Sequence, residues 1–251
     1  MAELYWLGQM GLMVKSKETG ICIDYFASPT AERRVAPPLA TEDLSDVDAF
    51  LGTHNHLDHI DHEAWKIWTR AYPDAKFVFA ETHRKAVLAD GVAPENAIGL
   101  NDGESVRVGD MTIHAIAAAH EFLEMDEATG LYPHLQYIVE ADGTKIYHAG
   151  DTLRYEGMLA KLKAFGHIDA ALLPINGRDA RRYTHGCIGN MTFQEAADLA
   201  GELAPAVAIP GHWDMFADNG ADPKEFADYL EAKYQGKVAC LIPKIMERIT
   251  V

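Results

Sequence analysis

Four short apolar runs in this chain each lead into a histidine or an aspartate, and this pattern limits the folds open to the sequence. The runs and the residues after them are residues 47–53 before His54, 113–119 before His120, 145–149 before Gly150 and Asp151, and 206–210 before Gly211 and His212. Apolar runs of this length are typical of buried strands. Strands that end at one edge of a sheet bring their following loops to one crevice, so we expect these side chains to lie together.

The densest part of the pattern is residues 53–59, which read Thr-His-Asn-His-Leu-Asp-His. Here His54, His56, Asp58 and His59 place three imidazoles and one carboxylate within six residues. A solvated polar loop is the alternative, but such crowding at a strand end rarely has only a surface role. Imidazole nitrogen and carboxylate oxygen suit Zn²⁺, Mn²⁺ or Fe²⁺, and the lack of cysteine here argues against a closed structural zinc site.

These residues give seven candidate ligands for two divalent metal ions per chain, zinc or manganese, with iron as a further option. We assign one ion to His54, His56, His120 and Asp151, and the other to Asp58, His59, His212 and Asp151. Asp151 has two carboxylate oxygens and is the natural bridge, and the glycine before it allows a sharp turn. The predicted catalytic residues are Asp58, which can also exchange a proton, and Asp151.

The other histidines have ordinary structural interpretations. We expect surface or helix-face positions for His62, His83, His134 and His167, and packed core positions for His114 and His148.

Hydrophobic spacing predicts an α/β protein, with antiparallel strands first and alternating strands and helices later. The predicted strands are residues 3–7, 11–15, 21–25, 47–53, 76–80, 105–108, 112–117, 135–140, 145–148, 170–175, 206–209, and either 239–242 or 248–251. The predicted helices are residues 60–71, 82–89, 155–165, one from Thr192 and one from Asp222. Residues 121–132 and 176–190 are expected to be loops. Since no linker interrupts the pattern, we expect a single domain over residues 1–251.

The composition indicates which cellular compartment and which binding partners suit this protein. A net charge of −16 disfavours DNA or RNA as a partner. The chain has no apolar run long enough to span a membrane and no signal-peptide pattern at its start. Its three cysteines have no CxxC spacing, which fits a reducing cytosol. We therefore expect a cytoplasmic protein that acts on a small molecule, does not contact membranes, and can form a homo-oligomer.

The motif also identifies a family. Residues 54–59 match the HxHxDH signature of the metallo-β-lactamase superfamily, and His120, Asp151 and His212 follow in the order of that family's remaining ligands. Residues 190–192 and 209–214 resemble the branch that contains L-ascorbate-6-phosphate lactonase. The resemblance implies an αββα sandwich, in which two mixed sheets lie between helices and carry a dinuclear metal site at one edge.

The resemblance and the ligand set together predict a metal-dependent hydrolase. Its metal-activated hydroxide would attack a small, anionic lactone or ester similar to a sugar-phosphate lactone. One alternative is a small-molecule phosphodiesterase, because a two-metal clamp also suits in-line displacement at phosphorus. A second alternative is a di-metal redox protein.

Candidate substrate contacts come from the polar loop and the segment after His212. They are Asn176, Arg178, His185 and Trp213, with Phe216 and Tyr155 as further candidates for a pocket wall. A guanidinium at Arg178 can hold a phosphate or carboxylate through two hydrogen bonds. Arg181 and Arg182 could do the same or be solvated surface residues.

Overall fold

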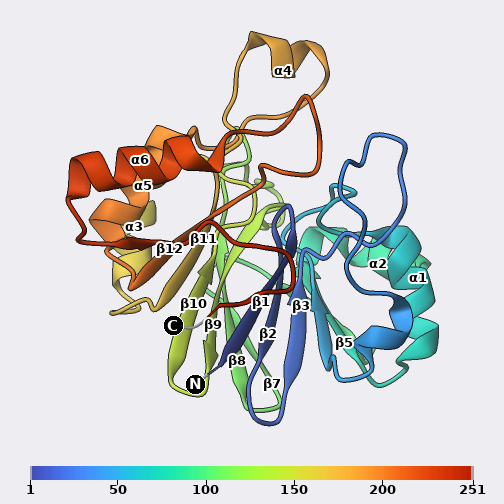
Figure 1. Cartoon of the computed structure of the whole chain (residues 1–251). Helices are drawn as coiled ribbons and strands as arrows, with labels where there is room; N and C mark the ends of the chain where they lie inside the picture. Colours follow the sequence, from blue (N-terminus) through green and yellow to red (C-terminus); the bar gives the residue numbers. More distant parts are fainter. Residues whose placement is uncertain (1, 250–251) are drawn as a thin grey trace.

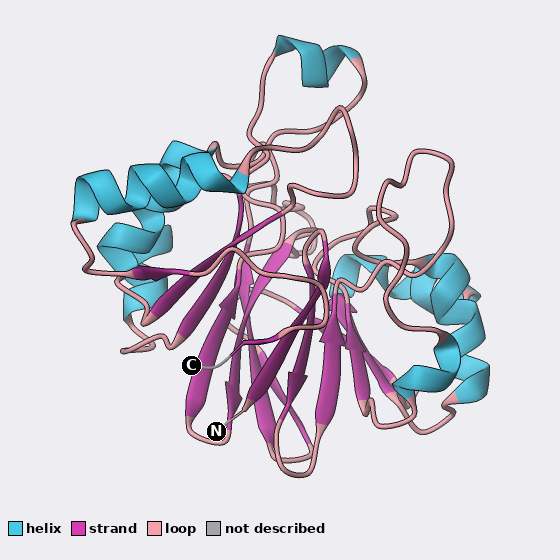
Figure 2. Cartoon of the chain, viewed as in Figure 1, coloured by secondary structure: helices cyan, strands magenta, loops and turns pink. Residues whose placement is uncertain are grey.

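Two seven-stranded sheets lie face to face, and helices cover their outer faces (Figures 1 and 2). The structure is a computed structural model, and it describes residues 2–249. The chain forms most of the first sheet, then the second, and returns to the first through its last strand.

The first sheet has the strand order β14-β1-β2-β3-β4-β5-β6. Its strands are β1 Glu3–Gly8, β2 Gly11–Lys15, β3 Gly20–Ile23, β4 Ala49–Leu51, β5 Lys76–Ala80, β6 Ala97–Leu100 and β14 Arg248–Ile249. Pairing is antiparallel from β14 to β3 and parallel from β3 to β6. The parallel strands therefore end at the same edge of the sheet.

The second sheet has the strand order β13-β12-β11-β10-β9-β8-β7. Its strands are β7 Ser105–Val108, β8 Met111–Ala117, β9 Leu135–Ala141, β10 Thr144–His148, β11 Ala170–Pro174, β12 Val207–Gly211 and β13 Ala239–Cys240. Strands β7 to β10 pair antiparallel, and β10 to β13 pair parallel.

Helices flank both sheets (Figure 2). Beside the first sheet lie η1 Thr41–Leu44, α1 His62–Ala71, η2 Glu81–His83 and α2 Arg84–Ala89. Beside the second lie α3 Met158–Lys163, α5 Phe193–Leu203 and α6 Pro223–Tyr234, while α4 Ala180–Thr184 stands apart in a long loop (Figure 1). Within residues 2–249, none of these helices is both long and apolar enough to cross a membrane.

The core consists of three apolar layers. Strand residues alternate between faces, so Ile209 packs between the sheets while its neighbour Ala208 packs under the helices of the second sheet. In the first sheet, Val78 likewise faces the other sheet and Phe77 faces α1. Parallel strands that are buried on both faces read as continuous apolar runs, which explains their sequence pattern.

The predicted αββα sandwich is confirmed. Several local features differ from the prediction. Asp61 accepts a hydrogen bond from the Ala64 amide, so α1 begins at His62 instead of residue 60. The short helix α4 lies inside the predicted loop 176–190, and it is capped by Asp179. Both candidate C-terminal strands form, one in each sheet. The prediction of one domain over residues 1–251 stays a prediction.

Candidate metal centre

Four loops meet at one edge of the two sheets and bring seven metal-competent side chains together. Residues 54–59 follow β4, His120 follows β8, Asp151 follows β10 and His212 follows the end of β12. Their ligand atoms form three overlapping groups, each within 4.8 Å: His54, His56 and His120; His54, His59 and Asp151; and Asp58, His59 and His212. The convergence expected from the four strand ends is therefore present.

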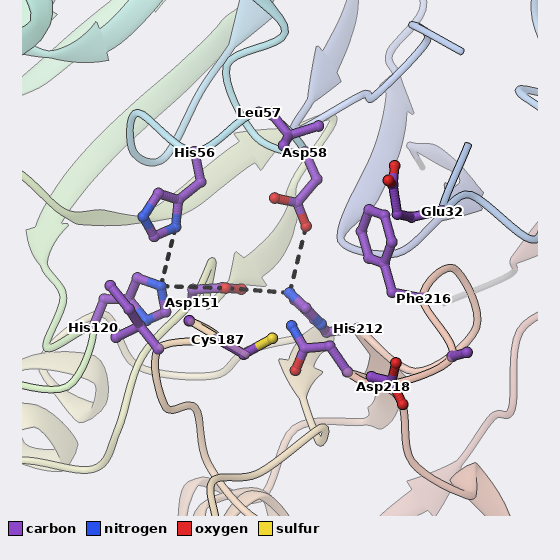
Figure 3. Close-up of a pocket in the computed structure, with 14 residues that line it drawn as sticks. Glu32, His56, Leu57, Asp58, His120, Asp151, Cys187, His212, Phe216 and Asp218 are labelled. Atoms are coloured by element: carbon purple, nitrogen blue, oxygen red, sulfur yellow. Dashed lines mark hydrogen bonds and ion pairs between the residues drawn. The ribbon is translucent and has the colours of Figure 1, made fainter. Parts of the chain in front are cut away.

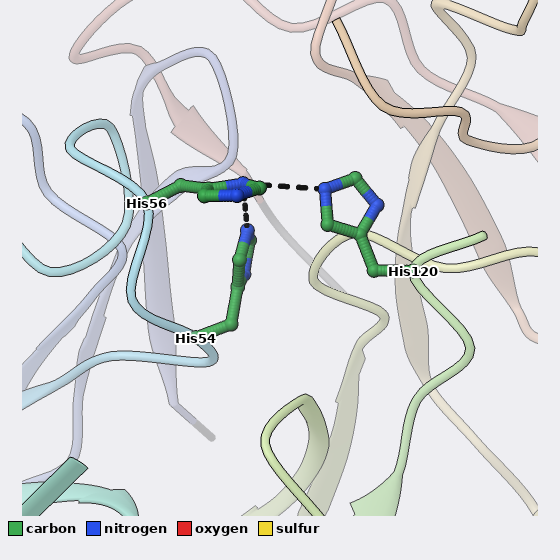
Figure 4. A group of neighbouring side chains, drawn as sticks. All are labelled: His54, His56 and His120. Atoms are coloured by element: carbon green, nitrogen blue, oxygen red, sulfur yellow. Dashed lines mark hydrogen bonds between the residues drawn. The ribbon is translucent and has the colours of Figure 1, made fainter. Parts of the chain in front are cut away.

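In the first group, three imidazole rings face one point (Figure 4). The Nδ1 atom of His56 lies 2.9 Å from Nε2 of His54 and 3.3 Å from Nε2 of His120. The Nδ1–H of His120 donates to the carbonyl of Gly189, which leaves its Nε2 with a lone pair. Because His56 Nδ1 carries at most one proton, it cannot donate to both neighbours. A cation at this point would satisfy all three nitrogens.

The second group lies on the other side of Asp151 (Figure 3). Its Nε2 atoms, from His59 and His212, each lie 3.6 Å from Oδ2 of Asp58. Asp151 reaches both groups, because its Oδ1 is 3.4 Å from His59, and its Oδ2 is 3.2 Å from His212 and 3.7 Å from His120. This position fits the predicted bridging role.

The protonation states of His54, His120 and Asp151 favour a cation. Burial, with repulsion from neighbouring imidazoles, holds the pKa of His54 well below its ordinary value, and burial lowers the pKa of His120 to about 4. Burial alone would raise the pKa of Asp151, but His212 and His59 hold it well below its usual range. Neutral imidazoles beside an ionised carboxylate are the form in which these groups bind metal.

Two buried atoms in the cluster have no hydrogen-bond partner: Nε2 of His59 and Oδ1 of Asp151. Both residues are almost completely buried. An unsatisfied buried polar atom costs free energy, so two such atoms facing each other call for a ligand. The nitrogen and oxygen donor set, without cysteine, fits divalent zinc, manganese or iron.

Asp24 orients His59, and the sequence analysis did not identify it. Its Oδ2 accepts a 2.7 Å hydrogen bond from Nδ1 of His59, which directs Nε2 into the cluster. Its carboxylate also accepts hydrogen bonds from the amide and the hydroxyl of Thr53. Because burial opposes the proton on His59 but Asp151 and Asp24 favour it, the pKa of His59 lies well above its ordinary value. A metal ion bound at His59 would therefore displace a proton.

Gln9 is a second residue that the sequence analysis missed. It lies in the turn between β1 and β2, is fully buried, and has a left-handed backbone with φ of 54°. Its Nε2 donates to Oδ2 of Asp58 at 2.9 Å and lies 3.2 Å from the His212 ring nitrogens. No local pattern distinguishes this glutamine, because its partners are 49 and 203 residues away in sequence.

His134 is closer to the site than its predicted surface position suggested. Its ring lies 5.5 Å from the rings of His54 and His120. Burial lowers the pKa of His134 to about 3. His148 occupies a core position as expected, and its Nε2 donates to the carbonyl of Met10.

A cavity of about 490 Å³ opens beside the cluster, and His56, Asp58, His120, Asp151 and His212 line one side of it. None of the four predicted substrate contacts lines this cavity. Arg178 instead forms two hydrogen bonds with Glu195, and Asn176 bonds to Asn219 and Asn190.

His185 and Trp213 also lie outside the lining of this cavity. The exposed His185 donates to the carbonyl of Arg181, and Trp213 stacks on Trp6 with ring centroids 5.2 Å apart. Phe216 does line the cavity, whereas the Tyr155 hydroxyl donates to the carbonyl of Ala117. The roles of Asn176, Arg178, His185 and Trp213 as substrate contacts stay predictions.

Known proteins resemble this chain in sequence and fold. Residues 20–213 match the model of the β-lactamase superfamily domain. A Salmonella choleraesuis protein named "Probable L-ascorbate-6-phosphate lactonase UlaG" is 28% identical over 92% of this chain and 74% of its own length. The metallo hydrolase Igni18 from Ignicoccus hospitalis is 25% identical, with a TM-score of 0.75 over 99% of this chain and 97% of that one.

A diiron β-hydroxylase, CmlA from Streptomyces venezuelae, shares the fold alone. It is 15% identical, with a TM-score of 0.73 over 100% of this chain and 54% of its own.

Fold and site together define an αββα protein with a histidine and aspartate cluster capable of binding metal at one sheet edge. The chain belongs to the metallo-β-lactamase superfamily.

Proposed function

We propose that this protein is a metal-dependent hydrolase that cleaves a small lactone or ester. The observation that carries the proposal is the meeting of seven nitrogen and oxygen ligands beside one cavity, with Asp151 between the two groups. The lactonase name of the 28% identical relative supports a lactone as the substrate type.

Two divalent ions, zinc or manganese with iron as an alternative, fit the donor set. When bound, such ions supply a nucleophilic water at neutral pH and stabilise the negative charge that develops on the attacked carbonyl oxygen. His54, His56 and His120 would hold one ion; Asp58, His59 and His212 would hold the other; and Asp151 would touch both.

Asp58 is the proposed proton carrier. It lines the cavity, and its Oδ2 is occupied by the hydrogen bond from Gln9. This leaves Oδ1 to hold a proton taken from the attacking water and pass it to the leaving oxygen. Gln9 keeps the carboxylate in one orientation during both transfers.

The test is turnover by metal-stripped protein that has been reloaded with Zn²⁺, Mn²⁺ or Fe²⁺. We expect hydrolysis of five- and six-membered lactones or 4-nitrophenyl esters, and a loss of at least roughly a hundredfold in kcat/KM for His56→Ala and His212→Ala. His167→Ala is the matched control, because that imidazole is 65% exposed and outside the cluster. Elemental analysis of each variant reports its metal content.

Two outcomes would contradict the proposal. Turnover of bis(4-nitrophenyl) phosphate alone would favour the phosphodiesterase alternative. Iron with a reducible visible spectrum and no hydrolysis would favour the redox alternative.

The proposed location is the cytoplasm, and the free thiols of Cys22, Cys187 and Cys240 support a reducing compartment.

A further inference from the structure

The cavity wall is largely apolar outside the metal ligands. Leu57, Ile188, Phe216, Ala217 and Cys187 line it. Leu57 is 57% exposed and Ile188 is 37% exposed. Exposed apolar groups around a concave site mark a surface that binds an apolar part of a ligand.

The charged groups in the same wall are acidic. Glu32 and Asp218 line the cavity in addition to Asp58 and Asp151, and among the described residues no lysine or arginine does so. Figure 3 shows Glu32 and Phe216 across the pocket from His120. Glu32 forms no hydrogen bond or ion pair with any part of the described chain, so its charge is open to a ligand.

The arginines of residues 178–182 already have acidic partners, while Arg33 donates to the carbonyls of Val35 and Phe26 and lies outside the cavity lining. Arg178 is bound to Glu195 by two hydrogen bonds of 2.6 and 2.8 Å. Arg181 pairs with Asp218 at 2.6 Å, and Arg182 pairs with Asp179. A phosphate or carboxylate distant from the reacting carbonyl would therefore meet apolar groups and the Glu32 carboxylate, without a cation to replace its lost hydration.

On this basis we propose that the cavity accepts esters or lactones with an uncharged, apolar body and discriminates against anionic ones, and that Glu32 contributes to the discrimination. The inference rests on the proposed hydrolase function and specifies its substrate class. It departs from the sugar-phosphate substrate that the sequence resemblance implied. The apolar body would lie against Leu57, Ile188 and Phe216, with the reacting carbonyl toward the metal ligands.

The experiment compares two esters of similar size, neutral 4-nitrophenyl butyrate and anionic mono(4-nitrophenyl) succinate. For the wild-type protein, kcat/KM should favour the neutral ester by roughly tenfold or more. In Glu32→Gln, the ratio of anionic to neutral kcat/KM should rise about fivefold, the effect of one unit charge at about 4 Å in water. Glu32→Lys should raise it further.

Glu18→Gln is the matched control, because Glu18 is an exposed carboxylate in the turn between β2 and β3, away from the cavity. It removes the same charge and should leave the ratio unchanged. Equal or faster turnover of the anionic ester by the wild-type protein would overturn the proposal. The proposal would also be overturned if Glu32→Gln and Glu18→Gln had the same ratio of anionic to neutral kcat/KM.

Binding of uncleaved amides separates this inference from the proposed function. Isothermal titration should give tighter binding of butyranilide than of anionic succinanilic acid, and Glu32→Gln should narrow that difference. If no ester or lactone is hydrolysed but the binding preference holds, the proposed function fails and the cavity inference stands. If hydrolysis occurs but succinanilic acid binds as tightly as butyranilide, the cavity inference fails alone.

Discussion

Asp24 influences the metal cluster through another residue and does not line the cavity. Its carboxylate fixes the Nδ1–H of His59 at 2.7 Å and is fully buried. Carboxylates in this position hold a ligating imidazole in one tautomer and increase its basicity. Asp24 is therefore a positioning residue for the second proposed ion.

Replacing Asp24 with asparagine should weaken metal binding without abolishing the fold. We expect metal affinity to fall by roughly 10- to 100-fold, the range seen when a carboxylate behind a ligating histidine is removed. Competition with a chromophoric chelator measures the affinity. Asp48→Asn is the control, since Asp48 also accepts a backbone amide hydrogen bond, from Gly20, but lies outside the cluster. Equal affinities of the two variants would contradict the role of Asp24.

His120 should make the metal-free protein sensitive to acid. Its pKa is about 4 in the folded chain, below the ordinary value of 6.5. Between these values the unfolded chain binds a proton that the folded chain does not, so stability falls as the pH drops. At pH 5, the loss relative to pH 7.5 is about 2 kcal/mol from this residue.

Urea unfolding in the presence of a chelator tests the sign and the size of this pH dependence of stability. Between pH 7.5 and pH 5, wild-type protein should lose about 2 kcal/mol more unfolding free energy than His120→Gln. Equal losses would mean that His120 is not the group responsible.

At the residue scale, the sequence predicted the groups that chemistry makes distinctive. All seven candidate ligands meet in the structure. They could be predicted because imidazoles and carboxylates at strand ends have few other roles. The substrate contacts could not be predicted in the same way. Arg178 pairs with Glu195 on a different element, and only the folded chain reveals that competing partner.

A glycine two residues after strand β10 cannot be replaced by another residue without cost. Gly150 has a φ of 56°, and an added Cβ would lie 2.9 Å from the Cβ of Thr53. The turn at Gly150 lies between the strand and Asp151, against Thr53 and so next to the loop of residues 54–59. Both the backbone conformation and the close contact thus require glycine here.

Gly150→Ala should therefore destabilise the protein and reduce its metal content. The left-handed conformation costs an alanine about 1–2 kcal/mol, and the clash with Thr53 adds about 1–3 kcal/mol. Gly143→Ala is a matched control, because Gly143 has a φ of 79° but nothing within 4 Å of its added Cβ. Thermal unfolding and elemental analysis should show the smaller stability loss, and no metal loss, in the control. Equal losses of stability in the two variants would mean that the left-handed backbone conformation alone causes the destabilisation.

At the element scale, sequence patterns located elements that have strong periodicity or clear caps. Helix α5 begins after Thr192, as predicted, and the Thr192 hydroxyl accepts a hydrogen bond from the Glu195 amide in a capping box. Strand β6 was missed, because its four residues Ala97–Leu100 have two buried ends around a half-buried middle and show no alternation. Its pairing with β5 decides its conformation, and that pairing is not local in sequence.

At the scale of the molecule, the candidate centre joins the two sheets. Residues 54–59 come from the first sheet, whereas His120, Asp151 and His212 come from loops of the second. Bound cations would thus link the two halves of the sandwich, and metal affinity would contribute directly to the stability of the folded chain.

Removing metal should consequently lower the thermal unfolding temperature of the whole chain in one transition. A ligand at a thousandfold excess over its Kd stabilises the folded state by about 4 kcal/mol, and this contribution disappears in a chelator. Reloading with Zn²⁺ or Mn²⁺ should restore the unfolding temperature. Scanning calorimetry with and without chelator measures the difference.

Asp151→Ala tests whether the centre itself is responsible, because Asp151 reaches ligands of both groups. We expect this variant to lose metal, most activity and most of the metal-dependent rise in unfolding temperature. Asp228→Ala, an exposed carboxylate on α6, should keep all three. If Asp151→Ala retained two ions per chain and the full thermal response, the ions would be bound elsewhere and the two sheets would be held together by their apolar core alone.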